Sequence, residues 1–147
     1  MISNFLIIHE LIHFFGGLLV GSVFAKKFHD FKLIFVGVAA GLLIDIDHLV
    51  DLFLYAIPNR MFDPTLITKM DFFRLSGKVI VPLHSYELIF FIFILSFVMK
   101  KWKKYLLVIS LSFLIHTIID QLTYNPFILE YSFLYRLVNH FSVSSFR

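Results

Sequence analysis

The 147-residue chain contains no cysteine, and charged residues make up only 16% of it. Without cysteine the chain has neither a disulfide scaffold nor a thiolate metal site. So few charges cannot supply the polar surface of a soluble domain, and the chain is 59% hydrophobic with a mean hydropathy of +0.87. That hydrophobicity also excludes an intrinsically disordered chain. We therefore expect residues 1–147 to form a single membrane domain.

Four apolar runs are long enough to cross a bilayer as helices: Phe5–Phe24, Leu33–Ile57, Val79–Met99 and Tyr105–Tyr124. The first run lacks the basic start and the small-residue cleavage site of a signal peptide, which indicates a retained span. The sequence thus predicts an all-α integral membrane protein with a four-helix transmembrane bundle. The length leaves no room for a separate soluble catalytic domain, so any active site must be built from the spans.

The segment after the fourth span, at about residues 127–146, follows Pro126 and is rich in Phe, Tyr and Leu with few charges. Such a composition favours an amphipathic helix lying in the membrane interface, and packing over the bundle is the alternative.

The distribution of Lys and Arg predicts the orientation of the bundle. Loops 25–32 and 100–104 carry seven of these residues, against six in loop 57–78 plus the tail. The higher density places loops 25–32 and 100–104, the first and the third, in the cytoplasm and both termini outside a multi-pass inner or plasma membrane. Because no basic stripe or docking motif is visible, the pI of about 9.2 indicates anchoring to anionic lipid and no nucleic-acid partner.

The ionisable residues inside the apolar runs fall at corresponding depths. They are His9, Glu10 and His13 early in the first run, Asp45, Asp47, His48 and Asp51 late in the second, His84 and Glu87 early in the third, and His116 and Asp120 late in the fourth. In an up-and-down bundle these positions share one leaflet in either orientation. Pairs three or four residues apart also share a helix face, so we expect one polar centre.

The opposite half of the first two runs is apolar and contains small residues at regular spacing. Gly17 and Gly21 are four apart, as are Gly37 and Gly41. This pattern would let two helices approach closely, although glycine is also simply tolerated in membrane helices.

The polar centre requires neutralisation, because one charged side chain at mid-membrane costs about 2.5–3.5 kcal/mol. Carboxylate and imidazole ligands suit a divalent metal, zinc first, with manganese or iron as alternatives. A metal-free proton or ion pathway, or a network of polar contacts, could also neutralise these groups. The expected ligands are His9, His13, Asp45, Asp47, His48, His84, His116 and Asp120, the last of which could instead orient His116, and the candidate general bases are Glu10 and Glu87.

Two local motifs have competing interpretations. His9-Glu10-x-x-His13 matches the zincin signature, in which two histidines bind zinc and the glutamate activates water, but no recognised third-ligand signature follows. Asp45-x-Asp47-His48 supplies three ligands within four positions, and its alternative is a helix break at the membrane surface.

The ordered set resembles the small inner-membrane proteins known as predicted membrane-bound metal-dependent hydrolases, a family whose named example is described as LexA-binding. The matching positions run up to about Thr123: His9 or His13, then Asp45, Asp47 and His48, then His84-Ser85, then His116 and Asp120. Three family features differ here, with Ile44 in place of a proline, Pro82-Leu83 in place of a Gly-x-Thr lead, and Ser76-Gly77-Lys78 where a His-Arg pair is expected. Lys78 or Arg74 could replace the missing arginine.

Together these features predict a metal-dependent hydrolase acting on a lipid or a lipid-linked substrate, such as a phosphoester, at the membrane interface. Confinement of the cluster to one leaflet favours lipid headgroups over large soluble substrates. The alternatives are an intramembrane zinc protease built on His9, Glu10 and His13, a metal or proton transporter, and a non-catalytic membrane interaction protein.

Overall fold

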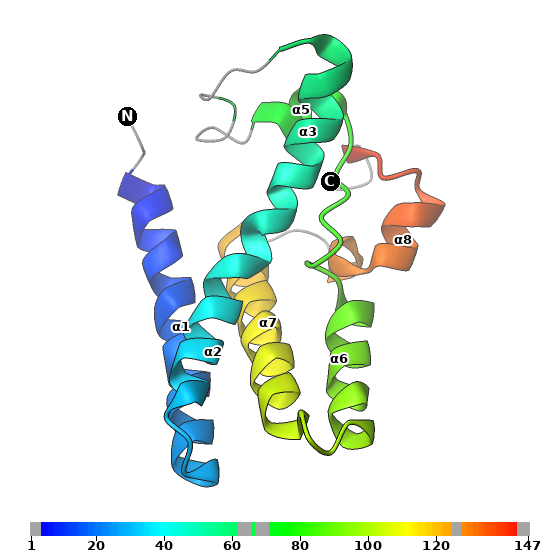
Figure 1. Ribbon diagram of the computed structural model, residues 1–147. Helices are drawn as coiled ribbons and strands as arrows, with labels where there is room; N and C mark the ends of the chain where they lie inside the picture. Colours follow the sequence, from blue (N-terminus) through cyan, green and yellow to red (C-terminus); the bar gives the residue numbers. More distant parts are fainter. Residues whose placement is uncertain (1–3, 62–65, 67–70, 125–127, 144–147) are drawn as a thin grey trace.

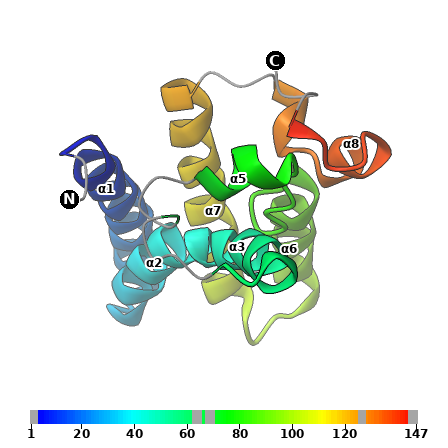
Figure 2. The same ribbon diagram turned by 90° about the horizontal axis from the view of Figure 1, so that it is seen from above.

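The computed structural model describes residues 4–61, 66, 71–124 and 128–143, and over these residues the protein is all-helical. The elements are α1 (Asn4–Phe28), α2 (Lys32–Leu43), the 3-10 helix η1 (Ile44–Asp47), α3 (His48–Asn59), α5 (Asp71–Ser76), α6 (Tyr86–Val98), α7 (Lys103–Tyr124), the 3-10 helix η2 (Ile128–Tyr131) and α8 (Phe133–Val138). Figure 1 shows α1, α2, α6 and α7 side by side, with α3, α5 and α8 gathered at the upper end. Viewed from that end, α5 lies beside α3 (Figure 2).

Three helices are long and apolar enough to cross a membrane: Leu6–Phe28, Lys32–Asn59 and Lys103–Tyr124. They correspond to the first, second and fourth predicted runs, and the second continues through α2, η1 and α3. Their outer faces are apolar, with Phe35 77% exposed and Leu122 79% exposed. The coarse prediction of long apolar helices is therefore confirmed for these three runs.

The third predicted run differs from the expectation, because only its second part is helical. Helix α6 has 13 residues, about 20 Å, against a hydrocarbon thickness of about 30 Å. It begins after Ser85, whose hydroxyl accepts a hydrogen bond from the Leu88 N–H and so caps the helix. Residues 79–85 are irregular because Pro82 has no N–H and the neighbouring N–H groups donate to side-chain carboxylates, as described below. The prediction of a helical span over Val79–Met99 is therefore wrong, because only Tyr86–Val98 is helical.

The predicted glycine contact is present between α1 and α2. A Cβ atom on Gly17 would lie 2.3 Å from the Gly37 carbonyl oxygen, and one on Gly37 would lie 2.4 Å from the Gly17 carbonyl oxygen. Only glycine allows the backbones to approach this closely. The same contact continues to Gly41, where a Cβ would lie 3.0 Å from the His13 carbonyl oxygen, and so fixes α1 and α2 relative to the polar cluster.

The tail forms η2 and the six-residue α8 in place of one long amphipathic helix; residues 127 and 144–146 of the predicted segment lie outside the described residues. The Arg136 side chain is only 1% exposed and Glu130 is 3% exposed, while Val138 on the outer side is 77% exposed. The described part of the tail therefore packs over the bundle, which is the alternative considered above.

An ion pair joins the turn between α1 and α2 to the start of α7, at the end of the bundle opposite α3, α5 and α8. The Lys104 ammonium at the start of α7 donates to the Asp30 carboxylate after α1, and the Tyr105 hydroxyl donates to the same oxygen over 3.3 Å. Lys104 holds the pKa of the Asp30 carboxyl below its usual value.

Candidate metal centre

The second span tightens at η1, and this turn places the first acidic residues of the cluster. A 3-10 helix has three residues per turn, so residues i and i+3 lie one above the other. Asp45 and His48 have this spacing, and Asp45 Oδ1 lies 3.2 Å from His48 Nε2. The chain remains helical on both sides of η1, so the predicted alternative of a helix break at the membrane surface does not apply.

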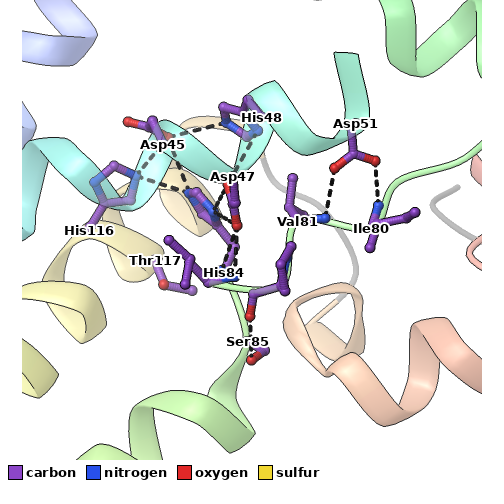
Figure 3. Close-up of polar contacts among 12 residues, drawn as sticks. Asp45, Asp47, His48, Asp51, Ile80, Val81, His84, Ser85, His116 and Thr117 are labelled. Carbon is purple, nitrogen blue, oxygen red and sulfur yellow. Dashed lines mark hydrogen bonds and ion pairs between the residues drawn. The ribbon is translucent and has the colours of Figure 1, made fainter. Parts of the chain in front are cut away.

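Asp47 and Asp51 point from this span toward the irregular segment 79–85 (Figure 3). The Asp51 carboxylate accepts hydrogen bonds from the N–H groups of Ile80 at 2.7 Å and Val81 at 2.9 Å. Asp47 accepts from the Leu83 N–H at 2.7 Å. A buried non-helical segment needs partners for its peptide groups, and these two carboxylates supply them.

The hydrogen-bond partners of His84 and His116 show which ring nitrogen of each carries a hydrogen. Nδ1 of His84 lies 3.1 Å from each oxygen of Asp47, and Nδ1 of His116 lies 2.8 Å from the Gly41 carbonyl oxygen. Because an ionised carboxylate and a carbonyl only accept, each Nδ1 carries a hydrogen and each neutral ring has its lone pair on Nε2. The two Nε2 atoms lie 3.2 Å apart. When both rings are neutral, two lone pairs face one another at this distance and repel, unless a proton or a metal cation lies between them.

Carboxylates surround this pair of nitrogens. Asp45 Oδ1 lies 3.2 Å from His84 Nε2 and 3.4 Å from His116 Nε2, and Asp120 Oδ2 lies 3.5 Å and 3.3 Å from the same two atoms. Asp45 Oδ2 is buried and has no hydrogen-bond partner within the described part of the chain. The arrangement offers negative charge and lone pairs to one point, as a cation site does.

A second set of ligand atoms lies between α1 and α7. His9 Nε2 and His13 Nε2 are 2.8 Å apart, and Asp120 Oδ1 lies 3.0 Å from the first and 3.1 Å from the second. The i, i+4 spacing of the two histidines on α1 places them together, as predicted, and α7 brings Asp120 to them. All three side chains are buried.

Three groups of ligand atoms are close enough to hold a metal ion, each with its atoms within 4.8 Å of one another: His9, His13 and Asp120; Asp45, His48 and His84; His84, His116 and Asp120. With metal–ligand distances of about 2.0–2.2 Å, ligands of one ion lie roughly 3–4 Å apart, so the spacings fit. Seven of the eight predicted ligands belong to these groups. The exception is Asp47, which contacts His84 at Nδ1 and orients its ring.

The two candidate bases have different positions. Glu10 lines the cavity described next. Glu87 lies away from it and accepts hydrogen bonds from the Ser132 hydroxyl and from the N–H groups of Phe133 and Leu134, at the start of α8. The predicted helical pairing of His84 with Glu87 is wrong, because α6 begins only after His84.

A cavity of about 300 Å³ opens beside the ligand groups. Its polar lining is His9, Glu10, Asp45, His48, His84, Asp120, Tyr124, Glu130, Tyr131 and Arg136, and its apolar lining is Leu6, Phe73, Val79 and Val81. Burial raises the pKa of the Tyr131 hydroxyl, which favours its neutral, hydrogen-bonding form. The cavity therefore combines metal-type ligands with an apolar wall.

Arg136 is a residue of this cavity that the sequence did not suggest. Its Nη1 donates to the carbonyl oxygens of Ile80 and Val81 at 2.8 and 3.0 Å, and its Nη2 donates to that of His84 at 2.8 Å. Nε has no hydrogen-bond partner in the described residues, and burial lowers the pKa of the guanidinium. Arg74 and Lys78, the predicted replacements for a missing arginine, are exposed and do not line the cavity. No local motif marks Arg136, since only the folding of the tail over the bundle brings it here.

Comparison with protein-family models, with curated proteins and with solved structures finds no match to this chain.

Proposed function

We propose that this protein is a membrane-embedded, metal-dependent hydrolase that acts on a lipid or lipid-linked phosphoester at the membrane interface. The observation that carries the proposal is the facing pair of Nε2 atoms on His84 and His116, 3.2 Å apart, each with its Nδ1 hydrogen committed elsewhere. Asp45 and Asp120 lie beside this pair. A divalent cation is the species that such a set of lone pairs and carboxylates binds.

The donor set fits zinc, manganese or iron, and a bound ion of this kind would lower the pKa of a coordinated water and polarise the ester. The protein's own residues complete the chemistry. Glu10 lies on the cavity wall and would accept the proton of the attacking water as general base. Asp47 holds the His84 ring in place through Nδ1. The Arg136 guanidinium would favour an anionic substrate at the same wall.

The apolar surroundings support a lipid substrate. Three helices are long and apolar enough to cross a membrane, and the cavity wall carries Leu6, Phe73, Val79 and Val81. The ligand groups lie toward one end of the bundle, above the glycine contact of α1 and α2. A membrane lipid could thus present its headgroup ester to the cluster.

The first test is metal analysis of the detergent-purified protein. We expect the wild type to retain a stoichiometric divalent transition metal, and His116→Ala and Asp120→Ala to lose most of it. His29→Asn is the matched control, because His29 lies far from the cluster in a turn and has a left-handed φ of 52° that asparagine tolerates. A wild type without stoichiometric metal, even after incubation with zinc, manganese or iron, would exclude the proposal.

One specific observation also favours an intramembrane zinc protease. The His9-Glu10-x-x-His13 motif acquires a third ligand in Asp120, at 3.0 and 3.1 Å from the two histidines. The protease hypothesis predicts that the wild type cleaves a peptide substrate, that Glu10→Gln alone abolishes this cleavage, and that phosphoesters are not hydrolysed. Cleavage that survives in Glu10→Gln would rule the protease out. The hydrolase proposal ranks first because a single zincin site leaves Asp45, His48, His84 and His116 unexplained.

A further inference from the structure

We infer that the centre binds two divalent ions, bridged by the carboxylate of Asp120. The inference rests on the proposed metal-dependent function and extends it by assigning a number of ions, a bridging residue and a substrate class. The starting point is that the seven donor residues form three groups of three. Two of the groups share Asp120, and the third, Asp45, His48 and His84, shares His84 with one of them.

The two oxygens of Asp120 face different histidine pairs. Oδ1 lies 3.0 Å from His9 Nε2 and 3.1 Å from His13 Nε2. Oδ2 lies 3.3 Å from His116 Nε2 and 3.5 Å from His84 Nε2. A carboxylate whose oxygens serve different ligand sets is the geometry of a bridge between two ions. One ion at either pair would leave the other pair of imidazole nitrogens crowded without a cation.

The stacking of two histidine rings shows that the two histidine pairs are direct neighbours. The rings of His13 and His116 lie nearly parallel, with centroids 3.5 Å apart and an interplanar angle of 14°. One ring belongs to each histidine pair, and the Nε2 atom of each faces its own oxygen of Asp120. Paired ions in two-metal hydrolytic sites lie about 3.5–4 Å apart, a spacing that requires neighbouring ligand sets such as these.

Each position has enough ligands and retains open coordination sites. The first ion would take His9, His13 and Asp120 Oδ1, and the second would take His84, His116 and Asp120 Oδ2, with Asp45 Oδ1 at 3.2 and 3.4 Å from the two nitrogens. Three or four protein ligands leave room for water and substrate on each ion. Two neighbouring ions clamp the attacking and leaving oxygens of an in-line displacement, which favours a phosphoester as the substrate class.

The test reconstitutes the metal-depleted protein in detergent with Mn²⁺ and records both the stoichiometry and the electron paramagnetic resonance spectrum. Two ions bridged by one carboxylate are expected to give two Mn²⁺ per chain and an exchange-coupled spectrum. His9→Ala is expected to reduce the stoichiometry to one and to replace the coupled spectrum by that of an isolated ion. Asp45→Ala should weaken binding of the second ion and leave the first in place. His29→Asn should behave as the wild type.

The outcomes separate this inference from the proposed function. One ion per chain, or two ions without coupling, in the folded wild type would overturn the bridge but would leave the proposed metal-dependent hydrolase standing. Absence of any bound ion would remove both. The wild-type spectrum is decisive by itself, so the result stands even where a variant fails to fold.

Discussion

Asp47 is a carboxylate inside an apolar span that belongs to none of the candidate metal-ligand groups but orients one of their histidines, His84. Its side chain is 2% exposed, and its oxygens accept hydrogen bonds from the backbone N–H groups of Leu83 and His84 and from His84 Nδ1. Burial of a carboxylate is costly, and these donors offset the cost. The same contacts fix which His84 nitrogen faces the cluster.

Replacing Asp47 by asparagine should weaken metal binding about 10- to 100-fold, because the ring of His84 loses the carboxylate that orients it. Asp51→Asn is the matched control: Asp51 also accepts from two backbone N–H groups, those of Ile80 and Val81, but among the described residues it shows no contact with the His84 side chain. Competition titrations with a chelator would measure both variants. Equal losses in the two variants would show that Asp47 acts only on the irregular segment.

The residues that could be predicted are those whose partners lie on the same helix. His9 with His13, and His116 with Asp120, follow from i, i+4 spacing, and the structure places both pairs as expected. The contact of Asp47 with His84 joins residues 37 positions apart, and Arg136 reaches its carbonyls over more than 50 positions. No spacing rule covers such contacts, which depend on how the elements pack.

At the scale of elements, α6 shows where hydropathy is insufficient. The run Val79–Met99 is largely apolar, but an apolar run does not distinguish a helix from a buried irregular segment. Residues 79–85 avoid the helix because Asp47, Asp51 and Arg136 satisfy their peptide groups. Such backbone is tolerated at membrane depth only where protein surrounds it. The sequence could therefore predict an apolar element here, but could not predict where its helix begins.

The glycine contact of α1 and α2 should be sensitive to a single methyl group. In Gly37→Ala the new Cβ would meet backbone atoms, at 2.4 Å from Gly17 O and 2.8 Å from Gly21 Cα. We expect the free energy of unfolding to fall by about 1–3 kcal/mol, with a loss of metal because Gly41 and His13 shift. Gly16→Ala is the control, since its Cβ would meet side-chain carbons, Ile115 Cγ2 at 2.9 Å and Ile119 Cδ1 at 3.3 Å, in place of backbone atoms. Denaturation in mixed micelles measures both, and equal stability of the two variants would contradict the prediction.

The ion pair between the two turns should make stability depend on pH. The pKa of Asp30 in the folded protein lies below its usual value of 3.8 because of Lys104. The folded state therefore binds this proton more weakly, and the pair's contribution is present above about pH 4 and is lost as the pH falls through the lower folded pKa. Asp30→Asn should flatten that part of the curve. The test compares the denaturation midpoints of wild type and variant between about pH 6 and pH 3. The same pH dependence in both would contradict the predicted contribution of the ion pair.

At the scale of the whole molecule, apolar side chains face outward and the ionisable cluster lies inside at one end of the bundle. Phe35 at 77% and Leu122 at 79% exposure suit contact with lipid, whereas His13, His84 and His116 are nearly inaccessible. Burying the cluster among helices avoids the cost of ionisable groups facing hydrocarbon. The turns at the opposite end carry a concentration of basic residues.

This polarity predicts the orientation, and the absence of native cysteine makes the test direct. Lys26 and Lys101 lie in exposed positions near the α1–α2 and α6–α7 turns, and Met61 lies exposed beyond α3. Because basic turns remain in the cytoplasm, we expect Met61→Cys in intact cells to react with a membrane-impermeant maleimide. Lys26→Cys and Lys101→Cys should react only after lysis. Reaction of both lysine-derived cysteines in intact cells would invert the orientation and place the ionisable cluster in the cytoplasmic leaflet. Reaction of only one of them would place the two turns on opposite sides of the membrane. This would contradict the fold, in which the ion pair of Lys104 and Asp30 joins the two turns.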